Sequence, residues 1–357
     1  MQIDGHHAMT YVVARYAGLN HHQASVVAYC AQYVDEATNE NPIYFENGAM
    51  FDRIVSAHKM LDYRNTVKLA NHMVWIPFHF LPGNHGNQAG HPPEGRFINR
   101  LICMPDSPVA RDMLRMVATH WHKPYALHML GIAMHVYADT FAHQGFAGVV
   151  HDINRVESIE SAQYMSLAER IRNDVLRHGI SSASPLGHGA ALSFPDRPYA
   201  SWIYVNGTGE TVVRDNTEIF VQAADAMCKA IQCYLAQDHA VKIDQQPGLT
   251  AQQRNLIESA LRTFDDEDGE RRHEQWLQHI ATGDFGFAPE VLTFHKTGPE
   301  SWKEKARGPA IVRDGKPYYK YSESFFSSDW KFFHDALKTY RLELIRDVLP
   351  AYGICVA

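Results

Sequence analysis

Residues 135–145 read HVYADTFAHQG and place His135, Asp139 and His143 at four-residue intervals. Residues four apart in an α-helix lie on one face with about 5 to 6 Å between their Cβ atoms, so His135 and Asp139 can bind one cation. His135 and His143 are separated by roughly 12 Å of helical rise, whereas two ligands of one zinc ion lie about 4 Å apart. The spacing therefore predicts two ions with the Asp139 carboxylate between them, or a distorted helix end.

The same spacing is also common on helix faces that bind nothing, so the surroundings of the stripe matter. Its neighbours in the sequence are apolar: Ala138, Phe141, Ala142 and Phe146. An aspartate buried among such side chains without a partner is costly. The chain also contains 22 histidines, and this excess, together with the apolar neighbours, favours metal binding.

Further candidate ligands lie closer to the amino terminus. Asp4, His6 and His7 precede the first predicted helix, Asp35 ends the apolar segment VVAYCAQYVD, and His79 lies within MVWIPFHFLPG. A single histidine in an aromatic segment is more often a packed core residue than a ligand. Several such residues in one chain together favour a metal site.

The order of these residues resembles that in the zinc-dependent bacterial phospholipase C and single-strand nuclease superfamily, over about residues 4–200. The resemblance implies an all-helical fold with a three-zinc cluster that cleaves phosphodiester or phosphomonoester bonds. By this resemblance, one zinc ion is held by Asp35, His79, His135 and Asp139, a second by His6 or His7 beside Asp139, and the remaining site begins at His143.

The chain departs from that superfamily at its amino terminus. The superfamily uses the amine of a mature amino-terminal tryptophan, created by signal cleavage, as a zinc ligand. Here the first residue is Met1, and MQIDGHHAMTYVVARYAGL lacks the features of a cleavable signal peptide. Asp4 is the candidate replacement for that ligand.

A second departure follows the central helix. The superfamily completes its site with H-x-x-x-E or H-x-x-x-D, and no such motif follows His143. The segment PLGHGAALSFPDRP offers His188 and Asp196 instead, and the adjacent His151 and Asp152 form a competing pair.

The chain also resembles an uncharacterised bacterial domain family. The shared features are an Asp-x-His at Asp4, the segment FHFLPG at 78–83 and the segment AHQGF at 142–146. This second resemblance implies no activity.

These residues predict a metal-dependent hydrolase that cleaves a phosphoester with metal-activated water, with Asp139 and Asp35 as the catalytic carboxylates. The expected cofactor is two or three zinc ions, although iron and manganese also suit His and Asp ligands. One alternative is an HD-type phosphohydrolase built on His151 and Asp152. The other is a non-catalytic protein that stores, senses or is stabilised by metal, against which the five scattered cysteines argue, because structural zinc often uses paired cysteines.

The composition restricts the partners. A net charge of −7 provides no basic surface for a long nucleic acid, so the expected substrate is a small-molecule or lipid phosphoester. No apolar run approaches the roughly 20 residues that span a bilayer. The expected location is the cytoplasm, or an exported location reached without a cleavable signal peptide. The oligomeric state is left open.

Helical periodicity predicts the elements that position these residues. The predicted helices cover residues 8–19, 23–38, 106–122, 124–147, 157–178, 215–237, 250–264 and 329–347. Loops rich in Gly, Pro and Ser cover 81–96 and 180–200, and IVRDGKPYYKY predicts a hairpin that turns at Asp314 and Gly315. We therefore expect an all-α, multi-helix domain with the metal cluster on a central helix over residues 1–240. A small, partly irregular extension with the hairpin would follow over residues 241–357 and supply no metal ligand.

Overall fold

The computed structural model describes residues 1–58, 68–161, 186–237 and 242–356. The α-helices in these ranges are α1 (Thr10–Ala17), α2 (His21–Glu36), α3 (Lys68–Phe78), α4 (Ile98–Leu101), α5 (Pro108–Ala118), α6 (Ala126–Ala142), α8 (Asn216–Leu235), α9 (Ala251–Thr263), α10 (Gly269–Thr282), α11 (Trp302–Arg307), α12 (Asp329–Glu343) and α13 (Leu349–Ala351). One-turn π-helices, η1 (Asp4–Met9) and η9 (Leu344–Val348), adjoin α1 and α12.

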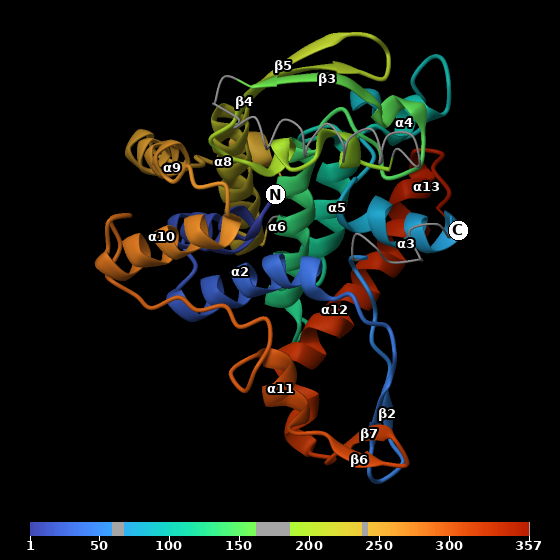
Figure 1. Cartoon of the computed structure of the whole chain (residues 1–357), viewed down its shortest axis with the longest axis vertical. Coiled ribbons are helices and arrows are strands. Elements are labelled where there is room, and N and C mark those ends of the chain that lie inside the picture. The colour runs from blue at the N-terminus through green and yellow to red at the C-terminus, as the bar shows by residue number, and fades with distance from the viewer. Residues whose placement is uncertain (59–67, 162–185, 238–241, 357) are drawn as a thin grey trace.

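Helix α6 lies at the centre of the molecule (Figure 1). Its residues are buried on nearly every face, as expected for a helix that is apolar all round. Helices α2, α5, α8 and α12 pack directly against it, and α1 fills the angle between α2 and α8. The stripe predicted from the sequence therefore lies inside the protein rather than on its surface.

A glycine allows the two helices α2 and α6 to approach closely. A Cβ atom at Gly131 of α6 would lie 2.5 Å from the carbonyl oxygen of Val27 and 2.6 Å from the Cβ of Cys30, both on α2. No larger residue fits there without a shift of the backbone. The crossing fixes the distance between Asp35 at the end of α2 and the histidine–aspartate stripe of α6.

The prediction of an all-α fold is wrong, because two small sheets accompany the helices. One has the strand order β2-β1-β7-β6, formed by β1 (Ile43–Phe45), β2 (Met50–Phe51), β6 (Ile311–Arg313) and β7 (Lys316–Tyr319). The other has the order β3-β4-β5, formed by β3 (Val156–Ser161), β4 (Ser201–Asn206) and β5 (Thr211–Asp215). The two sheets lie at opposite ends of the long axis in Figure 1.

The antiparallel sheet β3-β4-β5 covers a second, smaller hydrophobic core. Trp202 and Tyr204 of β4 point into this core, where Phe80 and Phe194 also lie, whereas Ile203 between them is partly exposed. This alternation is the two-residue period of a strand with one buried face. The small core supports the loop that carries His188 and Asp196.

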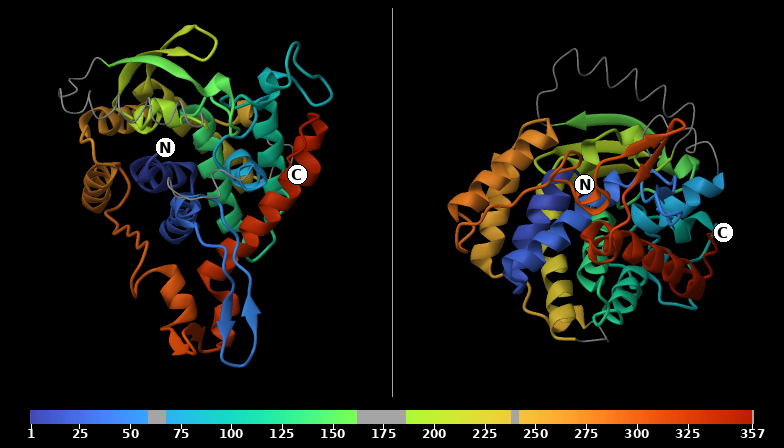
Figure 2. Two further views of the ribbon diagram at one scale, coloured as in Figure 1. Left: turned by 45° about the vertical axis from the view of Figure 1, so that its right-hand side comes forward. Right: turned by 90° about the horizontal axis from the view of Figure 1, so that it is seen from below.

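The hairpin predicted from IVRDGKPYYKY is confirmed as β6 and β7. Both turn residues, Asp314 and Gly315, have positive φ angles of 50° and 73°, as a type I′ turn requires. β7 also pairs in parallel with β1, where Tyr44 faces Tyr318. This contact joins segments from the two ends of the chain, as the views in Figure 2 also show.

Most predicted helices correspond to observed ones, but the helix predicted over 157–178 begins wrongly. Residues 157–161 belong to strand β3, and the rest of that prediction lies outside the described residues. The first predicted helix, over 8–19, contains the end of η1 followed by α1.

One hydrophobic core contains residues from both predicted segments, among them Met9 and Ala133 of the first and Trp276 and Leu337 of the second. The boundary near residue 240 itself stays a prediction. Among the helices of the described residues, none is both long and apolar enough to cross a membrane.

We predict that Gly131→Ala lowers thermal stability and weakens metal binding. The added methyl group forces α2 and α6 apart, and such overpacking costs about 1–3 kcal/mol. Differential scanning calorimetry measures the stability, and elemental analysis measures the metal content. The wild-type protein is the reference, and a Gly131→Ala protein that melts no lower than the wild type would contradict the tight crossing.

Candidate metal centre

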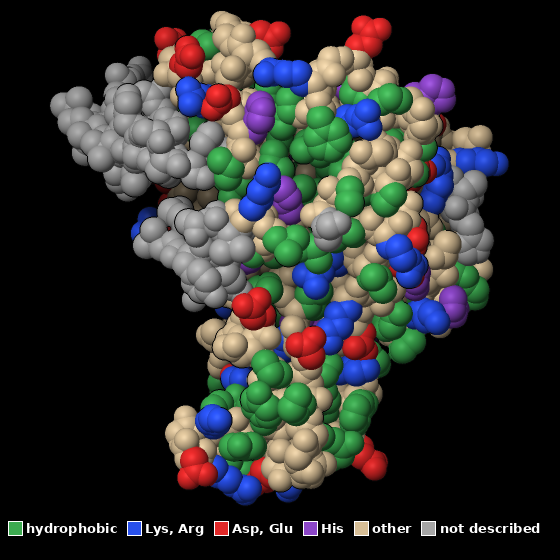
Figure 3. All heavy atoms as spheres, turned by 90° about the vertical axis from the view of Figure 1, so that its right-hand side faces the viewer, with side chains coloured by type: hydrophobic (Ala, Val, Ile, Leu, Met, Phe, Trp, Pro, Cys, Tyr) green, Lys and Arg blue, Asp and Glu red, His purple; other side chains and the backbone are tan. Residues whose placement is uncertain are grey.

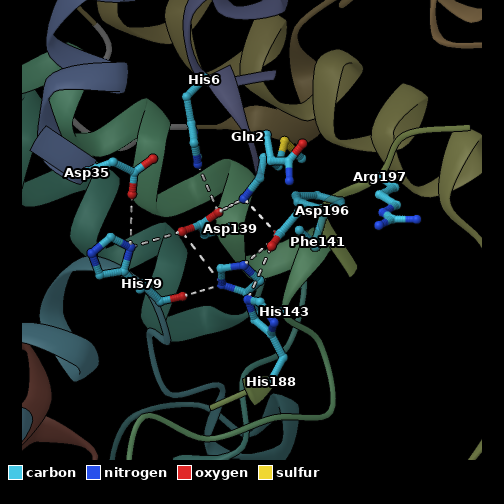
Figure 4. A network of polar contacts seen from close by, with 12 residues as sticks. Gln2, His6, Asp35, His79, Asp139, Phe141, His143, His188, Asp196 and Arg197 are labelled. Carbon is cyan, nitrogen blue, oxygen red and sulfur yellow. Dashed lines mark hydrogen bonds and ion pairs between the residues drawn. The ribbon is translucent and has the colours of Figure 1, made fainter. Parts of the chain in front are cut away.

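Five separate segments bring histidine and aspartate side chains together beside α6 (Figure 4). Three groups in the described chain have ligand atoms within 4.8 Å of one another: His6, Asp35 and His135; His79, His135 and Asp139; and His143, His188 and Asp196. His135 belongs to the first two groups. Each group includes at least one residue that is far from the others in the sequence, so the fold itself creates the cluster.

The first two groups share His135 and meet around His135 and Asp139. Asp139 Oδ2 lies 3.3 Å from His135 Nε2 and 3.5 Å from His79 Nδ1, and these two nitrogens lie 3.2 Å from each other. Asp35 Oδ1 completes the arrangement at 3.8 Å from His79 Nδ1 and 3.9 Å from His135 Nε2. Two imidazoles and two carboxylates therefore converge on one point.

Backbone carbonyls fix which nitrogen of each ring faces that point. His79 Nε2 donates to the carbonyl of Ser56 at 2.8 Å, and His135 Nδ1 donates to the carbonyl of Ala31 at 2.7 Å. Because a carbonyl oxygen only accepts, each ring carries its proton on that side, and in the neutral ring the other nitrogen holds a lone pair. Buried acceptors thus face one another, and Asp139 Oδ2 has no hydrogen-bond donor.

His6 approaches the same carboxylate from η1. Its Nε2 lies 3.2 Å from Asp139 Oδ1, and its ring stacks on His135 with 3.7 Å between the ring centroids. The side chain is fully buried, yet neither ring nitrogen has a hydrogen-bond partner. A buried polar group without a partner is costly, so His6 is a strong candidate ligand.

The amino group of Met1 lies between two carboxylates. It is 2.6 Å from Asp139 Oδ1 and 3.2 Å from Asp196 Oδ1. Burial lowers the pKa of this amine, but Asp139 and Asp196 outweigh burial and raise it to about 11. These contacts connect the two ends of the cluster.

The third group lies at the carboxyl end of α6, where His143 is the C-cap residue. His143 Nδ1 donates to the carbonyl of His79 at 2.7 Å, so its Nε2 faces Asp196 Oδ1 at 3.1 Å. His188 Nδ1 donates to the carbonyl of Leu192, and its Nε2 lies 3.4 Å from Asp196 Oδ2. Both rings thus donate through Nδ1 to a backbone carbonyl and turn Nε2 toward the Asp196 carboxylate, and for His143 this second contact is a hydrogen bond in which Nε2 donates.

Two further contacts hold this end of α6 in place. Phe80 stacks on the His143 ring with 4.7 Å between centroids. The buried guanidinium of Arg214 donates to the carbonyl of Ala142 at 2.7 Å, which satisfies a carbonyl that the helix end leaves free and places a cation at the negative end of the helix dipole.

The carboxylates are ionised in this environment. Burial by itself raises the pKa of Asp139, but His143, the Met1 amine and His6 outweigh it and hold the pKa well below the usual range. Asp196 behaves in the same way, because the Met1 amine and His188 outweigh burial.

The histidines divide into two kinds. Burial, followed by the charge of His135, lowers the pKa of His6 to about 3, and burial lowers that of His188 to about 4. Burial also opposes charge on His79, but its contacts with Asp139 and Asp35 raise the pKa overall. Neutral imidazoles and ionised carboxylates are the forms that bind metal ions.

The structure does not bring every predicted ligand into these groups. Asp4 pairs with Arg272 of α10, and the His7 ring contacts His273, so both point away from Asp139. His151 Nδ1 accepts from the backbone N–H of Ile153, and Asp152 pairs with Arg155. This pair lies outside the three groups, as do the cysteines and all described residues after 240.

Sequence reasoning did not find the groups that orient the ligands. The carbonyls of Ala31, Ser56 and Leu192 leave no trace in the sequence, because every residue has a carbonyl. The buried Met1 amine was not considered, because Asp4 was the expected replacement for the tryptophan amine of the superfamily. His188 and Asp196 were found as substitutes for the H-x-x-x-E or H-x-x-x-D motif that is missing after His143.

The chain belongs to a protein family described as "Family of unknown function (DUF6765)", whose model matches residues 1–348. This assignment agrees with the resemblance to an uncharacterised family. No curated protein and no solved structure matches the chain, so the resemblance to the zinc-dependent phospholipase C and nuclease superfamily gains no support from these comparisons.

We predict that His188→Ala removes up to one metal equivalent while the helical circular dichroism signal persists, because His188 lies in a loop beside Asp196. Elemental analysis of the purified protein measures the loss. His151→Ala is the matched control, a histidine that caps a short helix outside the three groups. Equal metal content in the two variants would remove His188 from the site.

Proposed function

We propose that this protein is a metal-dependent hydrolase that cleaves a phosphoester. One observation carries the metal binding: the free nitrogens of His79 and His135 face each other and Asp139 Oδ2, with each ring held in place by a backbone carbonyl. When both rings are neutral, these atoms are acceptors without a donor, and a cation between them would remove their repulsion. Histidines that bind a metal ion almost always donate their other ring N–H to a carboxylate, a backbone carbonyl or a water in this way.

The donor set fits zinc, and also iron or manganese. His79, His135, Asp35 and Asp139 would hold one ion, and His143, His188 and Asp196 a second. His6 would bind on the Oδ1 side of Asp139. When bound, the ions lower the pKa of a coordinated water toward 7 and polarise the phosphoryl oxygen.

The carboxylates of Asp139 and Asp35 have different roles in this proposal. Asp139, only 1% exposed, offers one carboxylate oxygen to each side of the cluster and holds the two halves at a fixed separation. The Asp35 side chain is 31% exposed, so its carboxylate is the one that accepts the proton of the attacking water and passes it to solvent. The apolar shell around α6 excludes other water.

A small substrate or a lipid head group suits this site better than a long polyanion. On the face shown in Figure 3, Lys and Arg side chains are interspersed with Asp and Glu, and the net charge of the whole chain is −7. A two-part cluster of this kind would suit in-line displacement at phosphorus, with metal chemistry available to both the attacking water and the leaving oxygen.

We predict that Asp139→Ala loses more than one metal equivalent and all hydrolytic activity, because both sides of the cluster lose a ligand. Asp139→Asn keeps the size but not the charge and behaves similarly. His143→Ala empties chiefly one site and retains part of the metal. Elemental analysis decides: equal losses of one equivalent in the Asp139 and His143 variants would mean that the stripe serves a single ion.

We predict that the wild-type protein hydrolyses at least one member of a panel of phosphomonoesters, phosphodiesters, phospholipids and single-stranded nucleic acids, assayed with added zinc, manganese or iron. Asp35→Asn is expected to lower the metal content, because Asp35 is a proposed ligand of the first ion, and to lower kcat about 100-fold or more, the usual contribution of a general base. Tight metal binding with no activity on any substrate would favour a structural or storage role instead.

A further inference from the structure

We infer that Arg272, on α10, is a positioning residue for the metal cluster: its buried ion pair with Asp4 fixes the turn of chain that carries His6. This inference rests on the proposed metal binding. It assigns to the carboxyl-terminal part of the chain a role in the site although none of its described residues lies within the three groups of candidate ligands.

His6 differs from the other histidines of the cluster in how it is held. The rings of His79, His135, His143 and His188 each donate to a backbone carbonyl. Neither nitrogen of His6 has a hydrogen-bond partner, and its ring only stacks on His135 and approaches Asp139. The backbone of η1 must therefore set the position of His6.

Helix α10 holds that backbone on both sides of His6. The Arg272 guanidinium donates through Nε to Asp4 Oδ2 at 2.6 Å and through Nη2 to Asp4 Oδ1 at 3.2 Å. The next residue, His273, is bonded through Nε2 to His7 Nδ1 at 2.8 Å. Two consecutive residues of α10 thus bind the residues that flank Gly5 and His6.

The Arg272 guanidinium also donates to two further oxygen atoms, which fix its position. Nη2 also donates to Gln2 Oε1 at 2.6 Å, and Nη1 donates to the carbonyl of Asp266 at 2.6 Å. The side chains of Arg272 and Asp4 are both essentially inaccessible to solvent. A buried, bidentate pair of this kind is directional and strongly coupled, so it transmits the position of α10 to η1.

The π-helical geometry of η1 explains why this turn needs its contacts with α10. π-helical turns are rare and occur mostly at functional sites. In η1 the turn directs His6 toward Asp139 and its neighbours Asp4 and His7 toward α10. Without the Arg272–Asp4 pair, the turn would keep the Met1 amine at Asp139 and the stacking of His6 on His135, but it would lose its bidentate contact two residues before His6.

The test is a double-mutant cycle between Arg272 and His6, read out as Zn²⁺ affinity in competition with a chromophoric chelator. Arg272→Met is expected to weaken Zn²⁺ binding by about 10- to 100-fold, as the loss of an outer-shell partner does, and His6→Ala, which removes a candidate ligand, by at least as much. The double variant should bind no more weakly than His6→Ala alone, because Arg272 acts through His6. With Co²⁺ as the probe, the visible spectrum of Arg272→Met should approach that of His6→Ala.

Arg271→Met is the matched control, a change of the neighbouring arginine whose side chain is 70% exposed, and it should bind Zn²⁺ as the wild type does. If Arg272→Met does not fold, Arg272→Lys takes its place, since lysine keeps the positive charge but cannot reproduce the two hydrogen bonds of the planar guanidinium to Asp4. Additive losses in the cycle, or an Arg272 variant that folds and binds normally, would overturn the positioning role. A wild-type protein that binds no Zn²⁺, Mn²⁺ or iron would instead defeat the proposed function.

Discussion

The burial of the Asp139 carboxylate is the constraint on which the rest of this structure depends. An ionised carboxylate in an apolar interior costs several kcal/mol unless it is paired, and α6 buries this one completely among the core helices. Positive or cation-binding groups therefore surround the Asp139 carboxylate: His6, His79, His135, His143 and the Met1 amine. Each belongs to the cluster because Asp139 is charged.

Backbone carbonyls are as important for the geometry of the candidate site as the side chains are. The ring orientations of four histidines depend on carbonyls of α2, of the segment near Ser56, of His79 and of Leu192. These carbonyls have the required distances only if α2 crosses α6 closely at Gly131 and the small core around Phe80 and Trp202 holds the loop of His188. The candidate metal centre therefore depends on the same packing as the hydrophobic core.

Local patterns predicted most of the helices and failed for the sheets. The apolar period of α2, α6, α8 and α12 is visible in a short window, and so is the Asp-Gly turn of the hairpin. By contrast, β1 is three residues long and pairs with β7, so that Tyr44 faces Tyr318. A strand of that length has no period to detect, and its partner lies almost the whole chain away. Strand β3, six residues long, was taken for the start of a helix, and its partner β4 also lies outside any short window, since Ile159 faces Tyr204.

For the site, the sequence alone determined that α6 presents His135 and Asp139 on one face, because four-residue spacing in a helix is local geometry. It also provided the residues from which a cluster could form. The tertiary structure decided which of them meet. His6 and His7 are adjacent and identical in type, yet one faces Asp139 and the other faces His273. Asp4, equally suited to bind a cation, is bound by Arg272 instead. Such choices depend on α10, more than 260 residues further along the chain, and no local pattern records which face of a turn a distant helix will cover.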